Sequence, residues 1–388
     1  MGQSAASSAR GDPAALRILL VEPYLTGSHK TWAEGLRRHS RHHVDILSLP
    51  GRHWKWRMHG GAVTLARAFL AQEQRPDLII ATDMLDLTTF LALTRPHTGE
   101  IPVALYVHEN QFAYPWSPED PDPGSGRDRH YGFLNFTSAL AADRVLFNSA
   151  FNRDSFLTGA RQLLQKMPDQ RETASVDTVA TKAEVLPLGL ALSAFDEHRP
   201  TPEPDPGPPL ILWNHRWEHD KNPEAFFRIL TDLAAEGRDF RLAVLGAPSS
   251  NPPPTFDTAR RQLADRIVAF GYADSFAAYA RWLWAADLLP ATSRHDFFGI
   301  SVMEALYCRT RPLLPRRMAY PELLPASWAE HCLYDDEEEL YRRLAERLDH
   351  GAEAGDMLTD LAATAGAYDW PRMAPRYDQT LAKIGPGG

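Results

Sequence analysis

The chain carries the sequence Asp296-Phe-Phe-Gly-Ile-Ser-Val-Met-Glu304, in which two carboxylates lie eight residues apart around a glycine. The residues after Gly299 have a helical composition, so this glycine predicts a helix start whose free N–H groups can face a phosphate. Glu304, one turn into that helix, could accept hydrogen bonds from a ribose diol, and Asp296 could bind sugar hydroxyls. The pattern is also compatible with an ordinary helix that has an acidic residue before it and one buried, neutralised glutamate.

A second stretch, eighty residues earlier, supplies two cations. Arg216 follows the apolar run Leu210–Trp213, and Lys221 precedes Asn222-Pro223, where the proline predicts another helix start. Ligands of open α/β sheets bind at the carboxyl ends of strands, and arginine and lysine both bind phosphates there. The two stretches together predict a site for a nucleotide diphosphate-sugar. The alternative is a solvated surface cluster with neighbouring acidic residues.

Strand-like apolar runs alternate with helical patterns along the whole chain, which predicts parallel, doubly wound α/β sheets. The expected strands are Arg17–Glu22, Val44–Leu49, Leu78–Thr82, Val103–His108, Arg144–Phe147, Leu210–Trp213, Arg241–Leu245, Ile267–Phe270, Leu288–Pro290 and Arg311–Leu314. A helix is expected from Lys30, another at Ala62–Gln74, and a last one at Tyr368–Lys383 that crosses both halves. The proline-rich segment at 198–209 is expected to join two Rossmann-like domains that face a cleft.

The expected organisation is a disordered tail at 1–14, an N-terminal domain at 15–197, the linker at 198–209, a C-terminal domain at 210–366, and a terminal helix and tail at 367–388. Two polar segments without periodicity, Ser117–Arg129 and Lys166–Lys182, are expected to be surface loops. The first contains Asp120-Pro121-Asp122, which is interpreted as solvated rather than as a metal site.

Composition narrows the class of protein. The 388 residues are enough for two domains, and the formal charge of −9 argues against indiscriminate nucleic-acid binding, although a local basic patch could still bind RNA. The two cysteines, Cys308 and Cys332, have no spacing typical of a zinc site or disulfide framework, which favours a cytoplasmic location. No apolar run approaches the about 20 residues of a membrane span.

Two polar stretches in the N-terminal half are candidates for the other wall of the site. Gly27-Ser28-His29 closes a strand-to-helix loop whose N–H groups could face a diphosphate, and His108 ends a predicted strand. A lone histidine is often a structural hydrogen bonder, and that alternative stays open. The polar run from His108 to Gln111 is nevertheless denser than a strand end requires.

A third stretch, from Arg52 to His59, interleaves aromatic and cationic residues. Cations can track RNA phosphates and indoles can stack on unpaired bases, so the stretch predicts contact with an RNA loop. The alternative is that the tryptophans belong to the core and the cations are merely solvated.

The sequences HRWEHDKNPE at 215–224 and DFFGISVMEA at 296–305 resemble the nucleotide-binding half of the retaining glycosyltransferases of family 4, which have the GT-B fold. The N-terminal stretches EPYLTGSHK, LPGRHWKWR and HENQFAYP resemble the tRNA-queuosine mannosyltransferases and their bacterial relatives. Further stretches beginning at Phe147, Pro187 and Ala319 are similar to the same group, and the likeness extends from about Leu16 to Leu324.

The resemblance implies a GDP-mannose donor, queuosine at the tRNA wobble position as acceptor, retention that gives an α-mannoside, and no metal or other cofactor. It implies catalytic roles for Arg216, Lys221, Asp296 and His108. The implied donor-binding residues are Gly27, Ser28, Arg216, Lys221, Gly271, Tyr272, Asp296, Phe298, Gly299, Ile300 and Glu304. The implied acceptor-binding residues are His29, Lys30, Arg52, Trp54, Lys55, Trp56, Arg57, His108, Glu109, Asn110 and Gln111.

The sequence departs from the family pattern at Asp296, where a glutamate is usual, and at Ser28, where a second glycine is usual. Two other functions remain alternatives: a related transferase that acts on a lipid, glycan or small metabolite, and a non-catalytic nucleotide-sugar-binding protein. The second is disfavoured because Arg216, Lys221 and Glu304 are all present.

Overall fold

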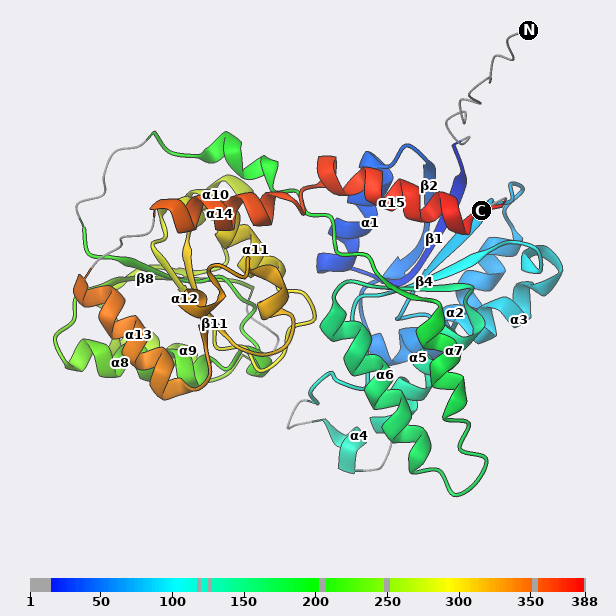
Figure 1. Cartoon of the computed structure of the whole chain (residues 1–388), viewed down its shortest axis with the longest axis horizontal. Coiled ribbons are helices and arrows are strands. Elements are labelled where there is room, and N and C mark those ends of the chain that lie inside the picture. Colours follow the sequence, from blue (N-terminus) through cyan, green and yellow to red (C-terminus); the bar gives the residue numbers. More distant parts are fainter. Residues whose placement is uncertain are drawn as a thin grey trace, which may run out of the picture.

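The computed structural model describes residues 15–116, 120–124, 128–201, 207–247, 252–350 and 355–386. These residues form two lobes, each built on a six-stranded parallel sheet with helices around it (Figure 1). The predicted fold class is therefore confirmed. The expected tail at 1–14 lies outside the described residues, as do parts of the expected linker and of the polar segment at 117–129.

The N-terminal lobe has the strand order β2-β1-β3-β4-β5-β6. Its strands are β1 (Arg17–Leu25), β2 (His43–Pro50), β3 (Leu78–Thr82), β4 (Val103–Val107), β5 (Arg144–Phe147) and β6 (Ala183–Val185). Its helices are α1 (Gly27–His39), α2 (Trp54–Leu70), α3 (Leu87–Thr98), α4 (Pro121–Gly124), α5 (Asp128–Ala141), α6 (Ala150–Gln165) and α7 (Ala174–Thr181).

The C-terminal lobe has the strand order β12-β11-β10-β7-β8-β9. Its strands are β7 (Leu210–Trp213), β8 (Arg241–Leu245), β9 (Ile267–Gly271), β10 (Leu288–Pro290), β11 (Arg311–Pro315) and β12 (Leu333–Tyr334). Its helices are α8 (Pro223–Ala235), α9 (Thr255–Gln262), α10 (Phe276–Ala285), α11 (Ile300–Tyr307), α12 (Ala329–Cys332), α13 (Glu337–His350) and α14 (Gly355–Gly366). The short 3₁₀ turns are η1 (Ser193–His198), η2 (His219–Lys221) and η3 (Tyr320–Leu323), and α15 (Trp370–Ile384) is the last helix.

Hydrophobic burial explains why the strands could be predicted. Every residue of β3, β4 and β7 is buried, because helices cover both faces of a parallel sheet and such strands read as continuous apolar runs. The short edge strands β6 and β12 lack that signal, and the sequence did not indicate them. The expectation of a loop at Lys166–Lys182 was wrong in part, since α7 forms there and buries Val176 and Val179.

The lobes are joined by two crossings that lie side by side. The segment Leu186–Leu192 runs from the first lobe to the second, and Leu190 pairs in parallel with Asp369, just before α15. Asp369 accepts hydrogen bonds from the backbone N–H groups of Leu192 and Ser193 at 2.8 and 3.2 Å. The residues of η1 already pack on the second lobe, because the Phe195 ring lies 4.9 Å from the Phe276 ring. The crossing therefore precedes the proline-rich segment where the hinge was expected.

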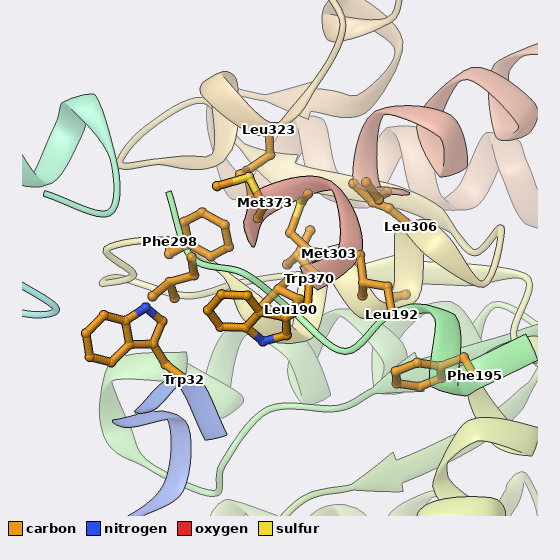
Figure 2. Close-up of a cluster of buried hydrophobic side chains, with 14 of the residues drawn as sticks. Trp32, Leu190, Leu192, Phe195, Phe298, Met303, Leu306, Leu323, Trp370 and Met373 are labelled. Carbon is orange, nitrogen blue, oxygen red and sulfur yellow. The ribbon is translucent and has the colours of Figure 1, made fainter. Parts of the chain in front are cut away.

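Helix α15 returns across the N-terminal lobe beside α1, as predicted (Figure 1). Trp370 lies between Gly35 and Gly189, and a Cβ at either glycine would come within 2.7 Å of its indole. Trp370 joins Leu190, Leu192 and Met303 in one hydrophobic cluster shared by both lobes (Figure 2). This shared core positions the carboxyl ends of the two sheets relative to each other. Among the described residues, no helix is long and apolar enough to cross a membrane.

Candidate active site

Lys221 lies at the centre of the C-terminal wall of the candidate site. Its ammonium donates to the carbonyl oxygen of His295 at 2.9 Å and pairs with Asp220 and Asp296 at 3.2 and 3.3 Å. The residue is only 8% exposed. Burial disfavours its charge, but Asp296 and Asp220 outweigh that effect and hold the pKa of Lys221 above its ordinary value. A buried, fully charged lysine is therefore available at this point.

Asp296 is fixed by two donors. Its Oδ2 accepts from the Tyr320 hydroxyl at 2.9 Å and from Lys221. Burial alone would favour the protonated acid, but the charge of Lys221 prevails, so the pKa of Asp296 lies below its ordinary value. The carboxylate is thus ionised and oriented before any ligand binds.

Arg216 differs from Lys221 in being exposed, and it pairs with Glu218 at 3.2 Å. Both cations follow β7, which neighbours β10 on one side and β8 on the other. This is the point at which the strand order reverses, where open α/β sheets bind ligands. The predicted helix start is also present, because α8 begins at Pro223.

Gly299 precedes α11 as predicted, with a φ of +93° that favours glycine. A Cβ there would lie 3.2 Å from both the Leu323 and Tyr320 side chains, so the space is also restricted. One turn into α11, Glu304 accepts a hydrogen bond from the Tyr279 hydroxyl at 2.6 Å. Burial raises the pKa of Glu304 to about 7, and the Tyr279 hydrogen bond opposes that rise.

Hydrogen bonds join the two loops of this lobe that carry Lys221 and Asp296. The Thr292 hydroxyl donates to the carbonyl oxygens of Lys221 and Asn222 at 2.9 and 3.0 Å, and the Arg294 N–H donates to the Asp220 carbonyl at 2.7 Å. Asp296 and Lys221 are therefore held as one unit.

Several buried polar atoms around this unit have no protein partner among the described residues. They are Oδ1 of Asn214, Nε2 of His215, Oδ1 of Asp220 and Nε2 of His295. Burial and the charge of Lys221 lower the pKa values of His215 and His295 to about 4, so both rings are neutral. Buried polar groups normally have hydrogen-bond partners. Several buried atoms without such partners at one place favour the binding of a polar ligand there.

The remaining predicted donor residues fall into two groups. Gly271 ends β9 with a φ of +119°, and Tyr272 beside it is 75% exposed, so this corner is open to a ligand. The Phe298 side chain is buried in the shared hydrophobic cluster, and Ile300 packs against that cluster (Figure 2). The Phe298 side chain is therefore not available to a donor, whereas Ile300 is only partly buried.

The N-terminal wall begins at the end of β1. Gly27 has a φ of +49° and starts α1, whose N-terminus has neither a side-chain cap nor an acidic residue in its first turn. His29 lies in that first turn and is buried against Glu22, with 2.9 Å between its Nδ1 and the carboxylate. Burial disfavours the imidazolium, but Glu22 outweighs it and raises the pKa of His29 to about 9.

His108 follows β4 and is 4% exposed. Its ring lies 4.2 Å from that of His29 and 4.6 Å from that of Trp32, and its backbone N–H donates to Asp83 at 2.7 Å. Burial and the charge of His29 hold the pKa of His108 well below its ordinary value. Its Nε2 and Oδ2 of Asp83 have no partner among the described residues, which again favours a ligand here.

The ligand-type atoms of Glu22, His29 and His108 lie within 4.8 Å of one another. Glu22 and His29 already satisfy each other, and Glu22 also accepts from the Tyr24 N–H at 2.7 Å. We therefore interpret Glu22 and His29 as a hydrogen-bonded pair beside the His108 ring rather than as metal ligands.

The two walls meet at the junction between the lobes. The Tyr114 ring lies 5.3 Å from that of His295, and the Ser149 hydroxyl donates to the Phe297 carbonyl at 2.6 Å. Glu109 is close enough to contribute to the electrostatics of both His29 and Arg216. The loop after β4 and the start of α6 in the first lobe thus contact the loop that carries Asp296 in the second.

Two predicted acceptor residues have structural partners. The Asn110 side chain is saturated, because its amide donates to Asn152 and Ser155 and its oxygen accepts from the N–H groups of Phe112 and Ala113. It shapes the loop after β4 rather than offering a free group. The Gln111 backbone donates to Asn135 at 3.1 Å, and its side chain is buried.

The aromatic and cationic residues from Arg52 to His59 include the first turns of α2. Some of their side chains pair with other residues, and others are exposed. Lys55 pairs with Asp120 and Asp122 at 2.7 and 2.5 Å. The interpretation of these two aspartates as solvated was therefore wrong, and Lys55 is not a free phosphate ligand. Trp54 is half-buried beside the Tyr131 ring at 5.1 Å, whereas Trp56 is 63% exposed.

The other cations of the predicted acceptor side are at the surface or at its margin. Arg52 is exposed, Lys30 is exposed with Glu34 at 3.9 Å, and Arg57 donates to the Pro50 carbonyl at 3.2 Å. A separate cavity of about 490 Å³ opens between α6 and Met318, but neither Lys221 nor His108 lines it.

Sequence reasoning assigned no role to Tyr279, Tyr320, Glu22 and Asp83. Tyr320 and Glu22 stand inside stretches that carried the family likeness, and Asp83 directly follows a predicted strand, so a signal existed for these three. Nothing marks Tyr279 in the sequence, because its role depends on α10 packing beside α11.

Comparison with known proteins identifies relatives of both lobes. The family profile described as "tRNA-queuosine alpha-mannosyltransferase N-terminal" matches residues 17–190, and that described as "Glycosyl transferases group 1" matches residues 194–325. A tRNA-queuosine alpha-mannosyltransferase of Drosophila melanogaster is 31% identical over 315 residues, which cover 79% of this chain and 81% of the relative.

A GDP-mannose-dependent alpha-(1-6)-phosphatidylinositol dimannoside mannosyltransferase of Mycobacterium tuberculosis is 24% identical over 258 residues, covering 65% of this chain and 60% of the relative. Among solved structures, the sucrose-phosphate synthase of Thermosynechococcus elongatus superposes with a TM-score of 0.70 at 14% identity, covering 95% of this chain and 99% of that one. The last likeness concerns the fold alone, which is GT-B.

Proposed function

Because the chain belongs to the tRNA-queuosine alpha-mannosyltransferase family, and is therefore a glycosyltransferase, we propose that it moves mannose from GDP-mannose to queuosine in tRNA. The product would be an α-mannoside, formed with retention and without a metal, in the cytoplasm. One observation carries the proposal: a charged, buried Lys221 held against Asp296, surrounded by unpartnered polar atoms, opposite the wall of Gly27 and His108.

The donor assignment follows from the charges of the C-terminal wall. Lys221, Arg216 and the α11 N-terminus at Gly299 supply the positive charge that a departing diphosphate requires. Asp296 would accept from the sugar hydroxyls, and Glu304 from the ribose. The mycobacterial relative is named for GDP-mannose, which supports this donor over other sugar nucleotides.

Atoms and charges balance in the proposed transfer. The bond between the mannose C1 and the diphosphate oxygen breaks, and a bond from C1 to the acceptor hydroxyl oxygen forms on the same face. The acceptor proton passes to the departing diphosphate oxygen, and GDP leaves. Because that oxygen takes the proton, no protein base is required, and Lys221 and Arg216 stabilise the negative charge that grows on the diphosphate. The contacts between the lobes would limit water at the reacting carbon.

The acceptor assignment rests on the family and on two exposed residues. Trp56 offers a free indole for stacking on an unpaired base, and Arg52 offers a free cation near it in the chain. The name of the Drosophila relative supports queuosine as the acceptor base.

The decisive experiment supplies queuosine-bearing and queuosine-free tRNA with a panel of sugar nucleotides and analyses the nucleosides by mass spectrometry. We expect a gain of one hexose on queuosine with GDP-mannose only. Transfer to a lipid or glycan extract, with no change in the tRNA, would favour the related transferase instead. Binding of a sugar nucleotide without any transfer would favour a non-catalytic protein.

A further inference from the structure

Glu22 and His29 form a buried pair that no part of the proposed reaction uses. Glu22 is fully buried near the end of β1, and His29 is 6% exposed in the first turn of α1. One carboxylate oxygen contacts Nδ1 of His29 at 2.9 Å, and the other accepts from the Tyr24 N–H at 2.7 Å. Both oxygens are thus committed, and the orientation of the imidazole is fixed.

The other ring nitrogen of His29 is Nε2. No described residue accepts a hydrogen bond from Nε2 of His29. Because Glu22 keeps the imidazole protonated, both ring nitrogens carry a proton, and Nε2–H is a directed donor. His29 therefore carries a donor that has no partner within the protein.

The place of this donor favours an anion. Glu22 offsets the charge of His29 on its Nδ1 side, and α1 has no acidic residue in its first turn that would repel a bound anion. Beside it, Gly27 leaves open space, with no atom within 4 Å of the position a Cβ would take. The uncapped N–H groups of the turn add to the attraction.

The opposite wall supplies the matching cations. Glu109 contributes to the electrostatics of both His29 and Arg216, so both cations lie within electrostatic range of one carboxylate. A helix N-terminus, a histidine and an arginine all offer donors, so a matching group must be an anion with several acceptor oxygens. A diphosphate meets that requirement, and the neutral queuosine diol does not.

We infer that Glu22 is a positioning residue that holds His29 so that its Nε2–H donates to the diphosphate of the sugar nucleotide. The inference rests on the proposed function for the presence of that nucleotide, and it moves His29 from the expected acceptor side to the donor side. The groups that face His29 are Glu22 and Tyr24 from the end of β1, Asp83 after β3, and His108 and Glu109 after β4.

The sign of the pH effect follows from the pair. With Glu22 present, the pKa of His29 is about 9, so the ring is charged at pH 8. Without the Glu22 carboxylate, burial still disfavours the imidazolium, and only the weaker attraction of Asp83 and Glu109 opposes that effect. The pKa of His29 therefore falls. A neutral ring bonded through Nδ1–H would then present a lone pair to the phosphate.

The test measures GDP-mannose binding by calorimetry for the wild type and for Glu22→Gln from pH 5.5 to pH 8. This probe has no phosphate that titrates in the range. We expect Glu22→Gln to bind about ten- to a hundredfold more weakly at pH 8, as loss of a charged hydrogen bond does, and the ratio to shrink towards pH 5.5. Asp45→Asn is the matched control, because it removes the carboxylate of the exposed His43–Asp45 pair of the same lobe. Its ratio to the wild type should stay near one.

A second variant separates folding from binding. His29→Gln can still donate to Glu22, and we expect the same loss at pH 8 but no recovery at pH 5.5. Failure of the wild type to bind any sugar nucleotide would overturn the donor assignment itself. Normal binding by both variants would overturn only the role of His29. Loss of binding on chelation, restored by a divalent ion, would show that these side chains hold a metal and would also overturn it.

Discussion

At the scale of single residues, the site consists of charges that are buried and already oriented. Lys221 and Asp296 stabilise each other in the charged state, although burial disfavours the charge of each. Such preorganisation stabilises charge that develops in a transition state, because the protein dipoles need not rearrange. Replacing one member of the pair should therefore lower turnover, and it should also lower stability because the other charge stays buried.

Lys221→Ala is expected to lower turnover by about a hundredfold or more, because the charge opposite the leaving group is lost. The assay is mannose transfer to queuosine-bearing tRNA at saturating donor. Lys182→Ala is the control, since Lys182 is also partly buried but donates only to backbone carbonyls such as that of Leu140 at 2.8 Å. Unchanged turnover in Lys221→Ala would refute the diphosphate assignment.

Glu304 gives the donor site a pH dependence. Its pKa is about 7, so ribose binding should strengthen as the pH rises through 7 and the carboxylate forms. The same raised pKa opposes folding progressively between the ordinary value of about 4.3 and 7, since the unfolded chain loses that proton first.

Tyr279→Phe removes the hydrogen bond that opposes this rise, and the pH at which donor affinity reaches half its maximum should move upward. Donor titrations between pH 5.5 and 9 measure the shift. Tyr341→Phe, which breaks a surface hydrogen bond to Glu236, should leave the profile in place. A downward shift in Tyr279→Phe would show that Tyr279 does not stabilise the carboxylate.

At the scale of elements, the sequence predicts best where burial and turn chemistry agree. The apolar run of β7 and the Pro223 start of α8 predict that both cations lie at the carboxyl edge of a sheet, as the structure has them. Roles that depend on packing between distant elements could not be predicted in this way. Tyr279 reaches Glu304 only because α10 lies beside α11, and Lys55 is neutralised only because α4 folds back over α2.

Gly299→Ala is expected to lower the free energy of unfolding by about 1–3 kcal/mol, because its φ is unfavourable for alanine and the new methyl group meets Tyr320. The start of α11 should shift, so donor affinity should fall as well. Urea unfolding and donor titration measure the two effects.

Gly237→Ala separates the cost of an unfavourable φ from the effect of the contact with Tyr320. Gly237 has a φ of +82° but no atom within 4 Å of the position of a Cβ. It should show the backbone cost alone, with unchanged donor affinity. Equal loss of affinity in both variants would mean that Gly299 has no local role at the donor site.

At the scale of the whole molecule, the first turn of α6 connects the lobes. Glu322 of η3 accepts from the N–H groups of Ala150 and Phe151 at 2.8 and 2.7 Å, and the neighbouring Ser149 reaches the Phe297 carbonyl. A carboxylate at a helix N-terminus is favourable, and here it belongs to the other lobe. The contact therefore favours the closed arrangement in which both walls of the site meet.

Glu322→Ala should shift the lobes towards a more open arrangement, seen as a larger radius of gyration in solution scattering, while circular dichroism stays unchanged. Glu330→Ala is the control, because Glu330 pairs with Arg316 within one lobe. Identical scattering from Glu322→Ala and the wild type would mean that the shared hydrophobic core alone sets the arrangement.

Helix α15 completes the first lobe with residues from the far end of the chain. The Tyr377 hydroxyl accepts from the Trp32 indole at 2.9 Å and lies 3.0 Å from the Tyr106 hydroxyl, while Asp378 accepts from Ser40 at 2.6 Å. On the ribosome, the first lobe must therefore wait for the synthesis of α15 before these groups find their partners. A nonsense mutation just before Trp370 should consequently prevent folding of the first lobe as well.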